Sequence, residues 1–130
     1  MTPVKLIRRA KEAMQHAYTP YSNFKVGAAL LTAEGKVYLG CNIENAAYSP
    51  SNCAERTAFF KAVYEGERNF TAIAVVGGRN GVIEDIFPPC GVCRQVMQEF
   101  CGPDFMIYMG RSDDSYVAVR LEDFLPYGFS

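Results

Sequence analysis

The sequence carries little net charge and no cluster of basic residues. Its formal net charge is −1, and Lys and Arg never occur in a run longer than two. A nucleic-acid-binding protein usually has a basic stripe that neutralises phosphates, so this composition argues modestly against DNA or RNA as the substrate. The sequence also lacks a signal peptide and an apolar stretch long enough to span a bilayer. We therefore expect no membrane partner.

Disulfide bonds are not expected either. The chain has five cysteines, an odd number, and without a secretory signal its thiols are expected to stay reduced in the cytoplasm. Hydrophobic residues make up 49% and charged residues 21% of the 130 residues, which is typical of a folded protein. This length suits one compact core, so we predict a single domain over residues 1–130.

Hydrophobic periodicity predicts a chain of mixed helices and strands. The predicted helices are Val4–Ala17, Cys53 to about Glu65, Cys90–Phe100 and a short final turn at Glu122–Leu125. The predicted strands are Val26–Thr32, Val37–Asn42, Thr71–Gly77, Phe105–Met109 and Tyr116–Leu121. We expect a loop between residues 77 and 89. The result is an α/β fold.

The lengths of the connections predict how these strands pair. A short turn at residues 33–36 makes the first two strands a hairpin. The helix at Cys90–Phe100 has the length of a right-handed crossover between two parallel strands, which places its start near the carboxyl ends of the strands, where sites form. The link over residues 110–115 is so short that the last two strands must be antiparallel.

Three cysteines lie where helices are predicted to begin. Asn52 is a good N-cap residue, so Cys53 falls on the first turn of a helix, where the exposed N–H groups lower the pKa of a thiol. Cys90 and Cys93 form a Cys-x-x-Cys motif at the next helix start, a usual way to give two thiolates to zinc. Three thiolates beside an unligated carboxylate, Glu55, predict a catalytic Zn²⁺ whose bound hydroxide is the nucleophile.

Glu55 and Arg56 each have two interpretations. Glu55 lies three residues after Asn52, which is close to a capping box, but a carboxylate near a zinc-bound water is what a proton shuttle requires. We favour the shuttle. Arg56 is either a solvated helix charge or a donor of hydrogen bonds to thiolate sulfur, and the second offsets the negative charge of the ligand set.

The remaining polar candidates are weaker. Asn42 and Glu44 are two residues apart on an extended chain, so they face the same side and suit the vicinal hydroxyls of a sugar. Polar residues on a loop would look the same. His16 is the only histidine and is interpreted as a solvated or capping group. Cys41 and Cys101 are interpreted as packing residues.

Together these residues resemble a known family. Cys53-Ala54-Glu55 and Pro89-Cys90-Gly91-Val92-Cys93 resemble the motifs of zinc-dependent nucleoside and nucleotide deaminases. The segments that resemble the small homotetrameric cytidine deaminases span nearly the whole chain and are 19–29, 40–46, 52–58, 90–96 and 125–129. The resemblance implies a three-layer α-β-α fold with a mixed five-stranded sheet. It also implies hydrolytic deamination of cytidine and 2′-deoxycytidine to the uridine forms, with release of ammonia, as in pyrimidine salvage.

The resemblance further implies a role for individual residues. One Zn²⁺ per chain would be held by Cys53, Cys90 and Cys93, with Glu55 transferring protons. The implied substrate contacts are Asn42 and Glu44 to the ribose, Phe24 to the base, and the Ala54 backbone to the pyrimidine edge. The short aromatic tail at 126–129 suggests apolar surface reserved for a partner. In the implied homotetramer, Phe129 of one chain packs over the base held by another.

Three alternatives stay open from the sequence. A deaminase of nucleic acid or of a nucleoside-like antibiotic would share the zinc motif, although the short turn before Tyr116 and the weak charge oppose the first. The antibiotic enzymes resemble this chain less at residues 42–46 and at Arg56. A non-catalytic zinc-stabilised module would need a fourth protein ligand, which neither Cys41 nor Cys101 clearly offers.

Overall fold

The structure is a computed structural model that describes residues 1–130. A five-stranded sheet with the strand order β2-β1-β3-β4-β5 forms its middle layer. The strands are β1 (Phe24–Thr32), β2 (Val37–Cys41), β3 (Phe70–Arg79), β4 (Met106–Gly110) and β5 (Tyr116–Arg120). Only β3 and β4 are parallel, and the β4–β5 pair is antiparallel. These features confirm the predicted mixed sheet and its pairing.

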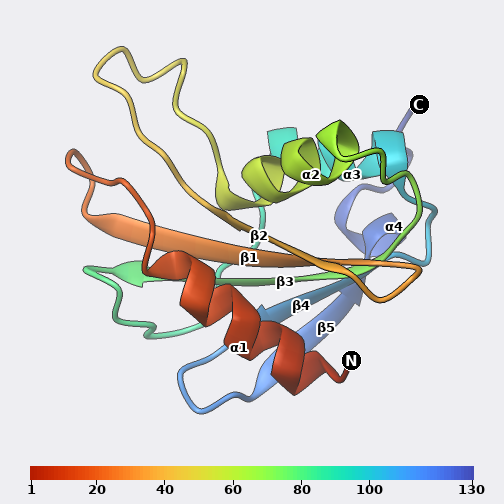
Figure 1. The fold of residues 1–130 in the computed structure, drawn as a ribbon, viewed down its shortest axis with the longest axis horizontal. Coiled ribbons are helices and arrows are strands. Elements are labelled where there is room, and N and C mark those ends of the chain that lie inside the picture. The colour runs from red at the N-terminus through yellow and green to blue at the C-terminus, as the bar shows by residue number, and fades with distance from the viewer.

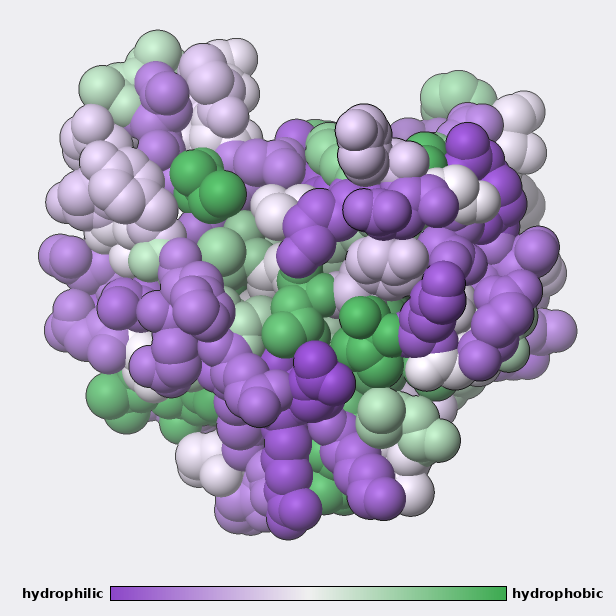
Figure 2. Space-filling view, viewed as in Figure 1, coloured by the Kyte–Doolittle hydropathy of each residue, from purple (hydrophilic) through white to green (hydrophobic).

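Helices cover both faces of this sheet (Figure 1). One face carries α1, and the other carries α2, α3 and the short α4. The helices are α1 (Pro3–Met14), α2 (Ala54–Tyr64), α3 (Gly91–Phe100) and α4 (Leu121–Phe124). No helix combines the length and the apolarity that a bilayer crossing needs. The outward face of α1 is hydrophilic (Figure 2).

The core is divided by the sheet into two clusters. In β3, Ile73 and Val75 face the larger cluster under α2 and α3, whereas Ala72, Ala74 and Val76 face the smaller cluster under α1. Because successive side chains of a strand point to opposite faces, a strand buried on both sides reads as one continuous apolar run. This is the reason that the sequence predicted β3 as the central strand.

The first helix is shorter than predicted. It ends at Met14 rather than Ala17, because the chain turns there and Tyr18 joins the segment after β2. The Tyr18 N–H donates to the Asn42 carbonyl at 3.0 Å, and the Glu44 N–H donates to the Tyr18 carbonyl at 2.9 Å. This pairing brings the aromatic loop before β1 against the residues predicted to bind a sugar.

A glycine fixes where α2 begins relative to β2. A Cβ atom on Gly40 would lie 2.3 Å from the Ala54 carbonyl oxygen and 2.6 Å from the Ala58 nitrogen, so only glycine lets the helix approach so closely. The start of α2 therefore lies directly over the end of β2. Sites on these two segments face one cavity.

Candidate active site

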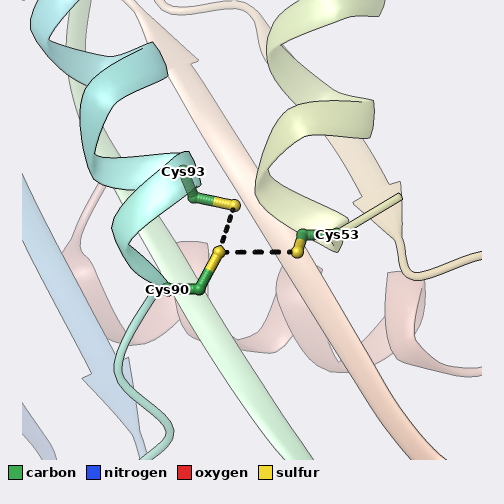
Figure 3. A group of neighbouring side chains, drawn as sticks. All are labelled: Cys53, Cys90 and Cys93. Carbon is green, nitrogen blue, oxygen red and sulfur yellow. Dashed lines mark hydrogen bonds between the residues drawn. The ribbon is translucent and has the colours of Figure 1, made fainter. Parts of the chain in front are cut away.

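Two helix N-termini bring the three predicted cysteine ligands together (Figure 3). Cys53 is the N-cap of α2, Cys90 is the N-cap of α3, and Cys93 lies in the first turn of α3. The Cys53 and Cys90 sulfurs are 3.7 Å apart, those of Cys90 and Cys93 are 3.4 Å apart, and all three lie within 4.8 Å of one another. Tetrahedral zinc with Zn–S bonds of about 2.3 Å needs sulfurs about 3.8 Å apart, so this donor set fits Zn²⁺.

The start of α2 differs from the prediction by one residue. Asn52 is not the N-cap, because it forms an antiparallel bridge with Ile43, and its side chain donates to the Thr57 hydroxyl at 3.2 Å. Cys53 takes the N-cap position and makes no side-chain capping bond. A capping box built on Asn52 and Glu55 is therefore not formed, which removes the structural alternative for Glu55.

Glu55 is a buried carboxylate that lacks a hydrogen-bond partner on one of its two oxygens. It is 1% exposed, and its Oε1 atom has no hydrogen-bond donor in the chain. Burial raises the pKa of Glu55 to about 7, because the charged form loses its water. Buried polar atoms are nearly always bonded, so an orphaned oxygen at the wall of a cavity indicates a missing ligand.

Arg56 lies where the sequence interpretation placed it. Its Nη2 donates to the Cys53 sulfur at 3.1 Å, and its buried Nε has no partner in the chain. The neighbouring Cys93 thiol and the hydrogen bond from Arg56 lower the pKa of Cys53 to about 5. The proximity of Cys53 and burial raise the pKa of the Cys93 thiol. The arrangement stabilises negative charge on the Cys53 sulfur.

These groups line a cavity of about 340 Å³. This is within the usual size range of small-molecule sites. The predicted site residues on its wall are Phe24, Asn42, Glu44, Cys53, Ala54, Glu55, Arg56 and Cys90. Cys93 is fully buried behind them. Residues from four separate segments of the sequence thus meet at one site.

The side chain of Asn42 is held next to this cavity by backbone groups at the start of β1. Its Oδ1 accepts from the Val26 N–H at 2.9 Å, and its Nδ2 donates to the Phe24 carbonyl at 2.8 Å. An amide group has capacity for further bonds beyond these two. Asn42 is therefore fixed in orientation and still able to contact a ligand.

Glu44 is held in a similar way by the loop before β1. Its Oε1 accepts from the Tyr21 and Ser22 N–H groups, each at 3.1 Å, and its Oε2 accepts from the Ser22 hydroxyl. The bond from the Ser22 hydroxyl is the main cause that lowers the pKa of Glu44 below its usual value. The carboxylate is thus kept charged and oriented as an acceptor.

Phe87 is a wall residue to which the sequence gave no role. Its ring lies 5.2 Å from that of Phe24, centroid to centroid, and both line the cavity. A Cβ atom on Gly77 would come within 3.2 Å of both rings, so this glycine makes room for the pair. The available signal was an aromatic residue immediately before Pro88-Pro89-Cys90, three residues ahead of a ligand.

Phe129, and the three residues that were interpreted as lying outside the site, do not line this cavity. Phe129 is 78% exposed, and its carbonyl accepts from the Gln95 side chain at 3.0 Å. His16 is exposed and contributes nothing to the sulfur cluster. Burial raises the pKa of Cys101 to about 12 and also raises that of Cys41, so both thiols stay protonated. Phe129 therefore does not contact the cavity of its own chain.

The known proteins that this chain resembles are cytidine deaminases. Residues 2–109 match the family model described as the cytidine and deoxycytidylate deaminase zinc-binding region. Cytidine deaminase of Sporosarcina psychrophila is 50% identical over 126 residues, covering 97% of this chain and 90% of the relative. The crystal structure of cytidine deaminase from Burkholderia pseudomallei is 48% identical with a TM-score of 0.91, covering 99% of this chain and 100% of the other. The cytidine deaminase of Halalkalibacterium halodurans is 48% identical over 125 residues, 96% of this chain and 92% of its own.

Proposed function

The chain belongs to the cytidine and deoxycytidylate deaminase family, and we propose that it hydrolyses cytidine and 2′-deoxycytidine to uridine and 2′-deoxyuridine with release of ammonia. One observation carries the proposal most directly. A buried carboxylate with an unpartnered oxygen, Glu55, lies on the same cavity wall as the Cys53 and Cys90 sulfurs. This is the arrangement needed to add water to a pyrimidine ring. The role would be pyrimidine salvage.

The sulfur cluster and Glu55 divide the chemistry. Bound zinc would supply a water acidic enough to add to C4 of the base near neutral pH. Glu55 would take one proton from that water and deliver it to the ring nitrogen N3, where it stays. It would then carry the second proton of the same water, from the new C4 hydroxyl, to the departing amino group. The C4–N bond breaks, ammonia leaves, and the carbonyl of uridine remains. The unpartnered Oε1 atom of Glu55 leaves this carboxylate free to accept and return a proton.

The negative charge of three thiolates needs compensation, since three thiolates and one Zn²⁺ sum to −1. Arg56 supplies a positive group that donates to the Cys53 sulfur. The N-termini of α2 and α3 both point at the cluster, and each carries a partial positive charge. Together they lower the electron donation from sulfur to the metal.

The other walls would hold the nucleoside. Asn42 and Glu44 are oriented acceptors and donors that suit the ribose hydroxyls. Phe24 and Phe87 would offer apolar contact for the base, and the Ala54 backbone at the start of α2 would bind its polar edge, since all three residues line the cavity. A charged Glu44 would repel the phosphate of an oligonucleotide, so a free nucleoside is the expected substrate.

One assay tests this function. Purified protein should convert cytidine to uridine, followed by ultraviolet absorbance, and a zinc chelator should abolish the conversion until Zn²⁺ is restored. A cytosine-containing oligonucleotide is the comparison substrate and should remain unchanged. Zinc-loaded protein that leaves cytidine intact would refute the proposal, and equal rates on the oligonucleotide would refute the nucleoside preference.

The proposed assembly is a homotetramer with composite sites, and the single domain would work in the cytoplasm, because no disulfide joins its five cysteines. Phe129, Tyr127 and Tyr48 are large apolar side chains left exposed on the chain. The segment after β2 that carries Tyr48 stands out as a lobe (Figure 2). Such surface suits contacts with a second copy.

Subunit exchange tests whether Phe129 acts on a neighbouring site. Glu55→Ala and Phe129→Ala proteins are mixed under conditions that exchange subunits. A hybrid can then combine an intact Glu55 site with a neighbour's intact Phe129, so activity should rise above that of both parents. Flat activity despite confirmed exchange would place Phe129 outside the neighbouring site.

A further inference from the structure

One arginine joins the ligand-bearing loop to the end of the chain. Arg94 follows Cys93 directly, and its Nε donates to the Pro89 carbonyl at 2.9 Å. Its Nη1 donates to the Phe124 carbonyl at 3.0 Å, and its guanidinium carbon lies 4.2 Å from the centre of the Phe124 ring. A single planar side chain thus bonds to two residues, Pro89 and Phe124, that are 35 positions apart in the sequence.

Helix formation does not account for an arginine at this position. Arg94 is the fourth residue of α3, close to the positive end of the helix dipole, and the first turn of α3 contains no acidic residue. A cation is unfavourable there. The charge-assisted bonds to two carbonyls and the contact with the Phe124 ring offset that cost. The placement is explained by these partners.

The two carbonyls belong to the short segment before Cys90 and to the short helix α4. Pro89 immediately precedes Cys90, so the bond to its carbonyl fixes how the chain enters this ligand. Helix α4 has four residues, too few to be stable by themselves. The next residue, Gln95, donates to the Phe129 carbonyl, so Arg94 and Gln95 together hold the C-terminal segment on α3.

We propose that Arg94 is a positioning residue that sets the Cys90 loop and the C-terminal segment at once, so that zinc retention and the seating of the Phe129 segment depend on one guanidinium. The inference rests on the proposed zinc site of the deaminase. It extends that site to a side chain whose donors bind the Pro89 and Phe124 carbonyls, neither of which belongs to the residues that line the cavity.

The first test is the rate at which zinc leaves the protein. Arg94→Met keeps the apolar stem and removes every donor. Zinc transfer to a coloured chelator should become about 10–100-fold faster, the usual effect of losing a group that orients a metal ligand. Arg68→Met is the matched control, because Arg68 also donates to two carbonyls, those of Val63 and Glu67, far along the chain from the cysteines. It should release zinc at the unmodified rate.

The second test reads the C-terminal segment. The chain has no tryptophan, so Phe129→Trp provides a reporter for this segment alone. Adding Arg94→Met should make the tryptophan more accessible to quenching by acrylamide, whereas adding Arg68→Met should not. Arg94→Lys serves if the Met variant does not fold. It keeps the charge but cannot occupy the Nε and Nη1 positions together, and should shift both readouts in the same direction by less.

A response of both readouts to Arg94, and of neither to Arg68, supports the inference. If zinc release or tryptophan quenching is the same in the Arg94 and Arg68 variants, the coupling is refuted. This failure is distinguishable from failure of the proposed function. In the latter case the unmodified protein itself binds no zinc or leaves cytidine intact.

Discussion

The two polar walls of the cavity are built in opposite ways. The metal wall, made of Cys53, Glu55, Arg56 and Cys90, stands on the starts of two helices. Two of its buried atoms, Glu55 Oε1 and Arg56 Nε, have no partner in the chain. The sugar wall, made of Ser22, Asn42 and Glu44, stands on loops, and its side chains are already bonded to neighbouring groups.

From this difference we infer that the metal wall would perform the proposed chemistry and that the sugar wall would bind the substrate. Unpartnered buried atoms are costly and are kept where a ligand or a reacting group completes them. Side chains already tied to the backbone lose little freedom when a ligand arrives, so they bind without rearranging. Changes in the metal wall should therefore lower kcat, and changes in the sugar wall should raise KM.

The largest effect is expected from the removal of one sulfur. Cys90→Ala leaves two thiolates, and zinc content should fall from one per chain to nearly none, with loss of activity. Metal analysis and turnover on one preparation measure both. Cys101→Ala is the control, since its pKa is raised to about 12 by burial and its sulfur lies outside the cluster. Zinc and activity both retained by Cys90→Ala would remove Cys90 from the metal wall.

The next largest effect is expected at the carboxylate of the same wall. Glu55→Gln keeps the shape but cannot move a proton, so kcat should fall by about 10²–10⁴-fold while zinc stays bound. Stability should hold or rise, because a neutral amide is cheaper to bury than an unpartnered carboxylate. Glu65→Gln, an exposed residue at the end of α2, is the control. A lower melting temperature with nearly full turnover would mean that Glu55 is structural.

The two walls also differ in how far the sequence revealed them. The three cysteines and Glu55 were predicted by spacing alone, because zinc ligation and helix starts both leave local signals. The burial of β3 was predicted for the same kind of reason, from a continuous apolar run. The predicted N-cap of α2 was wrong by one residue. Asn52 forms a bridge with Ile43, nine residues earlier, and this contact outweighs the capping preference of Asn52.

Contacts made through loops could not be predicted. The bonds from Tyr21 and Ser22 to Glu44 depend on how the loop before β1 folds against the segment after β2. Phe87 reaches the cavity only because its loop folds back on β3, where a Cβ atom on Gly78 would lie 1.9 Å from the Val82 carbonyl oxygen. Neither loop conformation produces a periodic pattern of residues from which it could be predicted.

A smaller effect is expected in the sugar wall. Glu44→Gln loses one charged acceptor, and hydrogen bonds to charged groups contribute about 1.5–3 kcal/mol, so kcat/KM should fall by about 10–150-fold, mainly through KM. The effect should nearly vanish for 2′,3′-dideoxycytidine, which lacks the hydroxyls. Glu34→Gln, in the hairpin turn, is the control and should match the unmodified protein. A fall in kcat with unchanged KM would show that this wall takes part in chemistry.

The smallest effect is expected at the aromatic pair between the walls. Phe87→Leu removes the ring that lies 5.2 Å from Phe24, and such pairs contribute about 0.5–1.5 kcal/mol beyond the area they bury. A contact of the same kind between the Phe87 ring and the base would be lost, so KM should rise by about 2–12-fold, since 1.4 kcal/mol is a factor of ten. Because the ring faces the base in this proposal, cytidine and 2′,3′-dideoxycytidine should be affected equally, unlike in Glu44→Gln. Measuring both substrates with both variants separates base contact from sugar contact. A Phe87→Leu effect confined to cytidine would assign Phe87 to the sugar wall instead.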